Sequence, residues 1–60
     1  MFDVIIVETA TRKAEAVIGR DLTERQADKR IEAGLRRCND NYFVGDYPAG
    51  KYKVGDVIAD

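Results

Sequence analysis

The clearest structural signal in this sequence is the stretch TERQADKRIEAGLRRC, residues 23–38. It opens with a capping box, in which the Thr23 hydroxyl accepts a hydrogen bond from the Gln26 amide and the Gln26 side chain reaches back to Thr23. Apolar or small side chains then recur at helical spacing and form one face, made of Ala27, Ile31, Gly34, Leu35 and Cys38. The pattern predicts a helix from Thr23 to about Cys38, with Asn39 as its C-terminal cap.

Two strands are predicted before this helix, over residues 2–7 and 14–18, joined as a hairpin through the polar segment 9–13. In the first strand both faces are apolar, with Phe2, Val4 and Ile6 on one and Ile5 and Val7 on the other. In the second strand, alternation places Ala14, Ala16 and Ile18 on one face and Glu15 and Val17 on the other. A strand with two apolar faces is typical of the centre of a sheet, or of a strand that meets another chain.

A short motif recurs after the helix, because Tyr42-Phe43-Val44-Gly45-Asp46 is echoed by Tyr52-Lys53-Val54-Gly55-Asp56. Each copy predicts a short strand that ends in a Gly-Asp turn. Between them we expect a type I turn with Pro48 at its second position and Gly50 left-handed. The predicted fold is one small α+β domain over residues 1–60. A single helix packs on a small antiparallel sheet in the order ββαβ, with a further strand at the C-terminal end.

The composition excludes most catalytic chemistry. The chain has 60 residues, no histidine, serine or tryptophan, and one cysteine, Cys38. Ser-His-Asp sites, Cys-His sites, Cys/His zinc sites and an internal disulfide are therefore ruled out. A chain this short buries only about 60% of the surface that its unfolded form exposes, which leaves little core to hollow out for a substrate. We expect no cofactor and no enzyme activity; a minimal enzyme completed at a dimer interface from Asp, Glu, Lys and Tyr is the remote alternative.

Charge and hydropathy argue against membranes and against whole-molecule attraction to nucleic acid. Ten Lys and Arg residues face eleven Asp and Glu residues, so the net charge is −1. The longest strongly apolar run is Val4–Val7, far short of the ~20 residues that a membrane span requires. The first residues show no secretory signal, and one unpaired cysteine suits a reducing compartment, so a cytoplasmic location is expected.

Half of the cations lie on the predicted helix and its end, and they form a candidate interaction surface made of Arg25, Lys29, Arg30, Arg36 and Arg37. At 100° per residue, Arg25, Lys29 and Arg36 line the face opposite the apolar one, and Arg30 and Arg37 lie on its flank. Such a stripe could contact phosphates. The alternative is a solvated helix face, because the net charge is negative and no aromatic residue interleaves the stripe.

A second candidate surface is the apolar face that one helix cannot cover. We expect a partner, and first a second copy of the chain, to cover it, since two-fold dimers dominate soluble oligomers. The candidate dimer or partner face consists of Ile5, Val7, Val17, Tyr42 and Tyr52. Tyr42 and Tyr52 could be cross-strand neighbours in the core, or part of a tyrosine-rich, acidic recognition surface.

Three smaller features are assigned to structure. Gly34 is expected to let the helix approach the sheet closely. Cys38 is expected to be a small buried hydrophobe. Asn39-Asp40-Asn41 is not a calcium loop, because Phe43 stands where the next ligand should be.

The stretch from Asp21 to Arg30, the pair Gly34-Leu35 and the strand Tyr42-Phe43-Val44 resemble segments of small uncharacterised proteins encoded by phages and prophages. The resemblance covers roughly residues 2–45 and implies an accessory protein that binds a host or defence component, with no catalytic residues. The sequence thus predicts a non-enzymatic, dimeric protein that acts by protein–protein interaction. The alternative is a nucleic-acid-binding regulatory protein that uses the basic helix face.

Overall fold

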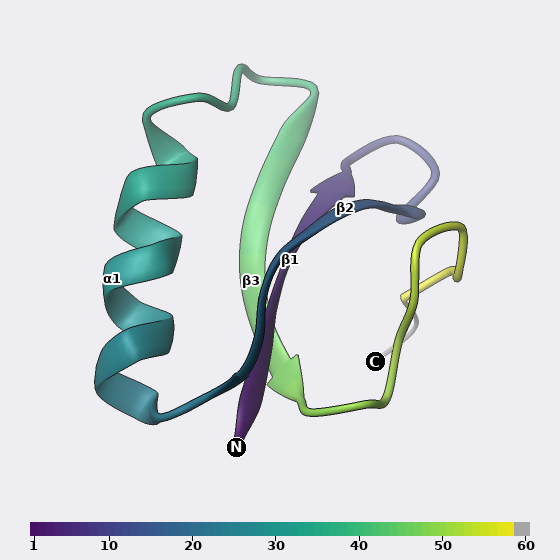
Figure 1. Ribbon diagram of the computed structural model, residues 1–60. Helices are drawn as coiled ribbons and strands as arrows, with labels where there is room; N and C mark the ends of the chain where they lie inside the picture. The colour runs from purple at the N-terminus through teal and green to yellow at the C-terminus, as the bar shows by residue number, and fades with distance from the viewer. Residues whose placement is uncertain (59–60) are drawn as a thin grey trace.

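The computed structural model describes residues 1–58 as one helix packed on a three-stranded antiparallel sheet (Figure 1). The elements are β1 (Phe2–Glu8), β2 (Ala14–Leu22), α1 (Glu24–Leu35) and β3 (Tyr42–Pro48). The strand order is β2-β1-β3, so the doubly apolar strand is central, as its sequence indicates. The predicted α+β class and the order ββαβ are confirmed.

Helix α1 begins as predicted and ends earlier. The Gln26 amide donates to Thr23 Oγ1 at 3.2 Å, and the Thr23 amide donates to Gln26 Oε1 at 3.0 Å, which completes the capping box. The helix stops at Leu35, three residues before Cys38, and the Arg37 amide bonds the Gly34 carbonyl at 3.0 Å. This tighter turn redirects the chain toward β3.

Gly34 has the predicted packing role. A Cβ at this position would lie 2.8 Å from Ile18 Cδ1 and 3.2 Å from Val44 Cγ2, so the absent side chain lets α1 settle on both outer strands. Ala27 is fully buried on the same helix face. Leu35, also assigned to this face by its spacing, is instead 56% exposed.

The opposite face of the sheet is covered by the chain's own C-terminal residues, which cross it on the side away from α1 (Figure 1). The core on this face is built from Ile5, Val7, Ala14 and Ile58, all buried. Val17, Phe43, Tyr47 and Tyr52 pack against it. The prediction that this face needs a second chain is therefore corrected, because Ile58 fills the place assigned to a partner.

The covering segment is tied to the start of β2 by backbone hydrogen bonds. Ala14 donates to the Asp56 carbonyl at 2.8 Å, and Gly55 donates to the Ala14 carbonyl at 2.9 Å. Ile58 donates to the Arg12 carbonyl at 2.8 Å, and Arg12 Nε donates to the Ile58 carbonyl at 2.9 Å. Within residues 1–58, sheet geometry in this segment is limited to an isolated bridge between Lys13 and Val57, so the further strand predicted near the C-terminal end is absent from the described residues.

The repeated motif does not repeat in structure. Gly45 lies inside β3 opposite Ile5, whereas Gly55 has φ +94° in a turn closed by the Asp56 amide and the Lys53 carbonyl. The turn after β3 is closed by Lys51 and Pro48, which places Pro48 first rather than second. Gly50 is left-handed as predicted, with φ +80° at the third position, which is typical of a type II turn rather than type I.

Irregular pairing in β2 changes which residues share a face. Ala14 pairs with Val7, but Ala16 pairs with Ile6, so Glu15 is an extra residue on the β2 side. Simple alternation predicts that Ala14 shares a face with Ala16 and Ile18. Because of the extra residue, Ala14 instead lies on the opposite face, in the core under the C-terminal segment.

Candidate functional site: a groove between α1 and β2

An open groove of about 500 Å³ runs between helix α1 and the β2 side of the sheet. Its floor and helix wall are apolar or small, and two arginines contribute to its lining. The lining residues are Ile6, Ile18, Arg30, Ala33, Gly34 and Arg37. Gly34 helps to form the groove as well as the core, because a side chain there would occupy the space above Ile18.

Arg30 is held in place at the groove by contacts with β2. Its Nη1 donates to the Ile18 carbonyl at 2.7 Å, and its Cγ lies 3.4 Å from the position that a Cβ on Gly19 would take. The hydrogen bond and the packed stem fix a positive charge beside the apolar floor. Arg37, in the turn that follows α1, also lines the groove.

The predicted basic surface is divided by the structure. Arg30 and Arg37 line the main groove, whereas Lys29 and Arg36 line a separate depression of about 190 Å³ together with Glu32 and Ala33. Arg25 is exposed and, at 100° per residue, lies near Lys29 on the outer face of α1. The five cations therefore form two groups, divided as helical spacing predicts.

The predicted dimer or partner face is not an exposed surface. Ile5 and Val7 are fully buried, and Val17 and Tyr52 are partly buried against the same core. Tyr52 pairs with Tyr47, edge to face at 5.4 Å between ring centroids, rather than with Tyr42. The structure thus favours the core role for this tyrosine.

Tyr42 lies apart from the other four residues of that predicted face. It alternates in β3 with Phe43, which packs under the C-terminal segment, so Tyr42 faces the helix side of the sheet. The tyrosines do not gather on one surface.

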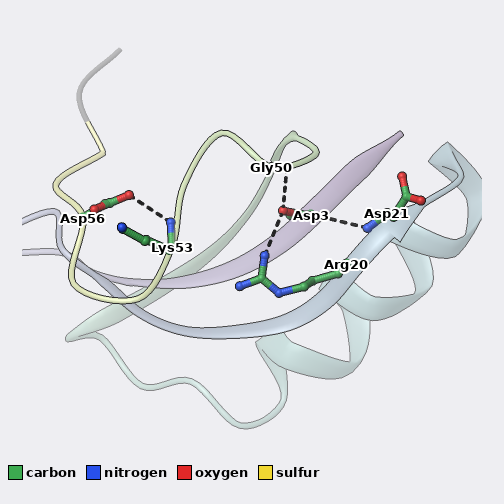
Figure 2. Close-up of polar contacts among 6 residues, drawn as sticks. All are labelled: Asp3, Arg20, Asp21, Gly50, Lys53 and Asp56. Atoms are coloured by element: carbon green, nitrogen blue, oxygen red, sulfur yellow. Dashed lines mark hydrogen bonds and ion pairs between the residues drawn. The ribbon is translucent and has the colours of Figure 1, made fainter.

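Asp3 was not singled out by the sequence pattern, yet it is buried at 2% exposure and contacts Asp21, Gly50 and Arg20 (Figure 2). Its Oδ1 accepts from the Asp21 amide at 2.8 Å, its Oδ2 accepts from the Gly50 amide at 3.0 Å, and Arg20 Nη1 lies 3.5 Å from Oδ2. The Gly50 hydrogen bond, helped by Asp21 and the Arg20 charge, lowers the pKa of the Asp3 carboxyl against the opposing effect of burial. An acidic residue on the same strand face as Ile5 was the available signal.

Asp3 is a clamp rather than a reactive group. Its carboxylate links the end of β2 to the turn after β3, and both oxygens already accept backbone donors. A carboxylate held ionised in this way is a poor proton donor.

Neither an acidic side chain nor Cys38 lines the groove. Within residues 1–58, no three His, Cys, Asp or Glu side chains converge as metal ligands would. Cys38 is partly exposed beyond the end of α1, not the buried hydrophobe that the sequence predicts, because the helix stops short of it.

Among these same residues, no helix is long and apolar enough to cross a membrane. No protein-family model, curated protein or solved structure matches this chain.

Proposed function

We propose that the protein is a non-enzymatic binding protein that docks a segment of a partner protein in the groove between α1 and β2. The partner segment presents an acidic side chain to Arg30 and Arg37 and an apolar side chain to the floor formed by Ile6 and Ile18. The observation that supports this proposal is the combination of an apolar floor with two arginines in one groove.

The chemistry of the groove selects this class of partner. Guanidinium groups bind carboxylates through paired, charge-assisted hydrogen bonds, and arginine is enriched at energetic centres of interfaces. Arg30 is already oriented by the Ile18 carbonyl, so less side-chain freedom is lost when a carboxylate binds. Burial of one leucine-sized side chain on the floor contributes about 1.5–3 kcal/mol.

Binding without catalysis is supported by the structural role of the buried carboxylate. Both oxygens of Asp3 accept backbone hydrogen bonds, and the carboxylate also forms an ion pair with Arg20. The groove itself is lined by two arginines and by aliphatic or small residues, which supply neither a nucleophile nor a general base near neutral pH.

The resemblance to small phage and prophage proteins suggests a host protein as the partner and inhibition of a host or defence component as the outcome. We also propose a cytoplasmic location, because one unpaired cysteine, Cys38, suits a reducing compartment. We also propose that the protein acts as a homodimer, although not through the face under the C-terminal segment.

A library of short displayed peptides tests the groove. We expect enrichment of peptides that carry Asp or Glu next to a large apolar residue. The double variant Arg30→Glu with Arg37→Glu should lose at least about tenfold in affinity for them and select Lys- or Arg-bearing peptides instead.

The matched control is Arg25→Glu with Lys29→Glu, which makes the same charge change on the outer face of α1. At physiological salt, where charges farther apart than about 8 Å are largely screened, it should bind within about threefold of wild type. Equal losses in both double variants, or no acidic preference in wild type, would refute the proposal.

Nucleic-acid binding is the second candidate, favoured by the outer group of cations around Lys29 and Arg36. It requires binding to an oligonucleotide that weakens steeply with salt. In that case the Arg25→Glu, Lys29→Glu variant would lose binding while the groove variant kept most of it. The absence of any oligonucleotide shift at low salt would remove this candidate.

A further inference from the structure

We propose that β3 is the interface through which two copies of the protein pair. The two β3 strands run antiparallel about a two-fold axis at Val44 and join the sheets into one of six strands. This interface lies on the sheet edge opposite the groove. The inference gives the homodimer proposed above its interface, and it does not depend on binding in the groove.

The hydrogen-bond pattern shows which backbone groups of β3 face outward. The register between β1 and β3 is uninterrupted, and it is flanked by the bonds Ala49 N–H to Met1 O (3.0 Å) and Thr9 N–H to Asn41 O (2.9 Å). In an antiparallel ladder bonded pairs alternate with unbonded ones. Alternation from these two bonded pairs gives the direction of the backbone groups of each β3 residue. The N–H and C=O groups that face β1 belong to Phe43, Gly45 and Tyr47. Those that face outward belong to Tyr42, Val44 and Asp46.

These outward groups are largely unpaired. The Tyr42 amide donates to the Asn39 carbonyl at 3.2 Å, but within residues 1–58 the amides of Val44 and Asp46 have no recorded acceptor. The carbonyls of Tyr42, Val44 and Asp46 likewise have no recorded donor there. An edge with free donors and acceptors at alternate residues is a template for another strand.

The other edge of the sheet is blocked, which singles out β3. The pairing of β2 with β1 is interrupted by register shifts. The Ile18 carbonyl of β2 accepts a hydrogen bond from Arg30, and Ala14, the first residue of β2, is hydrogen-bonded to the C-terminal segment. Bulges and covering groups are the devices by which natural sheets protect an edge. Strand β3 has no register shift along its seven residues.

The free groups of β3 are complementary to a second β3. If Val44 lies opposite Val44 of the second copy, their amides and carbonyls form two reciprocal bonds. Asp46 then lies opposite Tyr42 of the second copy, and each Asp46 amide meets a Tyr42 carbonyl. The pairing uses every free donor just described, and the two-fold symmetry satisfies both copies at once.

Leu35 supplies the apolar part of the interface. It is 56% exposed and follows Gly34, which sits over Val44. Because α1 contacts all three strands, two helices related by this axis lie about three strand spacings, or ~14 Å, apart. That gap is wider than direct helix packing at 8–10 Å and suits a pair of facing leucine side chains.

Asp46 provides a matched pair of variants, because its side chain is exposed and its amide points outward. Asp46→Pro removes the edge donor, and Asp46→Ala removes only the carboxylate. We expect wild type and Asp46→Ala to change from monomer to dimer between about 1 µM and about 500 µM in sedimentation equilibrium, as a small interface allows. Asp46→Pro should weaken the dimer by at least about tenfold.

Two further measurements keep the proposal falsifiable if Asp46→Pro fails to fold. Leu35→Glu changes an exposed side chain and should also weaken the dimer at least about tenfold. Amide exchange should show concentration-dependent protection of Val44 and Asp46, while Phe43 and Gly45 stay protected at every concentration. A wild-type monomer throughout this range, or protection that grows along β2 instead, would overturn the proposal.

Discussion

The buried carboxylate of Asp3 offers the sharpest test of how this small fold is held together. Asp3→Asn preserves the size of the side chain but leaves one acceptor oxygen for two backbone donors, the amides of Asp21 and Gly50. The side-chain NH₂ must then face one of those amides. Loss of one hydrogen bond to a charged group costs about 1.5–3 kcal/mol, and the buried amide that is left unpaired adds to it.

We therefore expect Asp3→Asn to lower the free energy of unfolding by about 3 kcal/mol. A chain of 60 residues has roughly 3–9 kcal/mol in total, so the variant should be partly or wholly unfolded at room temperature. The matched control is Asp21→Asn. This exposed residue keeps its backbone amide, and its φ of +53° is one that asparagine tolerates.

The pH dependence separates the charge of Asp3 from its shape. Because the folded pKa of Asp3 is lowered, its stabilising effect is complete above the unfolded value of about 3.9 and is lost as the pH falls through the folded pKa. Urea unfolding followed by circular dichroism should show wild type more stable than Asp3→Asn by a constant difference above about pH 4, and the two proteins converging as the pH falls further. Curves that stay parallel down to acid, or a difference under about 1 kcal/mol at neutral pH, would refute the clamp.

Three further substitutions test the packing. Ile58→Ala should cost about 2–5 kcal/mol in urea unfolding, because it empties the fully buried site that covers Ile5; a cost under about 1 kcal/mol would mean that the C-terminal segment is not a true cover. Gly34→Val should lower the free energy of unfolding by about 1–3 kcal/mol, because the branched side chain meets Ile18 and Val44. Gly34→Ala should stay within about 1 kcal/mol of wild type, because the higher helix propensity of alanine offsets its smaller clash. Gly50→Ala should cost about 1 kcal/mol through its left-handed φ alone, as nothing lies within 4 Å of the added Cβ; a neutral result in thermal melts would contradict the strain.

The parts of the fold that followed from sequence are those governed by local patterns. The capping box between Thr23 and Gln26, the apolar face of α1 and the two-sided apolar pattern of β1 each arise from residues a few positions apart. Residue spacing did not predict where α1 ends. Leu35 fits the apolar face by periodicity, but it is the last residue of the helix and its side chain is exposed.

The features that sequence did not predict depend on distant backbone groups. Asp3 is held by amides 18 and 47 positions away, and neither donor has a side-chain signature. The cover over Ile5 comes from Ile58, whose short apolar segment predicts strand or core equally well. Helical spacing already separated Arg30 and Arg37 from the other three helix cations. The bond between Arg30 and a carbonyl of β2 was not predicted, because no spacing rule contains it.

The two proposed surfaces lie on opposite edges of one sheet, and this placement makes them independently testable. Pairing through β3 leaves β2 at both outer ends of the joined sheet, so a dimer presents two grooves facing away from each other. A monomeric Asp46→Pro variant should therefore bind a groove peptide with the wild-type affinity per site, since Arg30 and Ile18 are untouched. Its binding should weaken only toward a surface that displays many peptides, where two linked grooves gain avidity. An equal loss for free and displayed peptide would mean that the edge and the groove are coupled through the central strand β1.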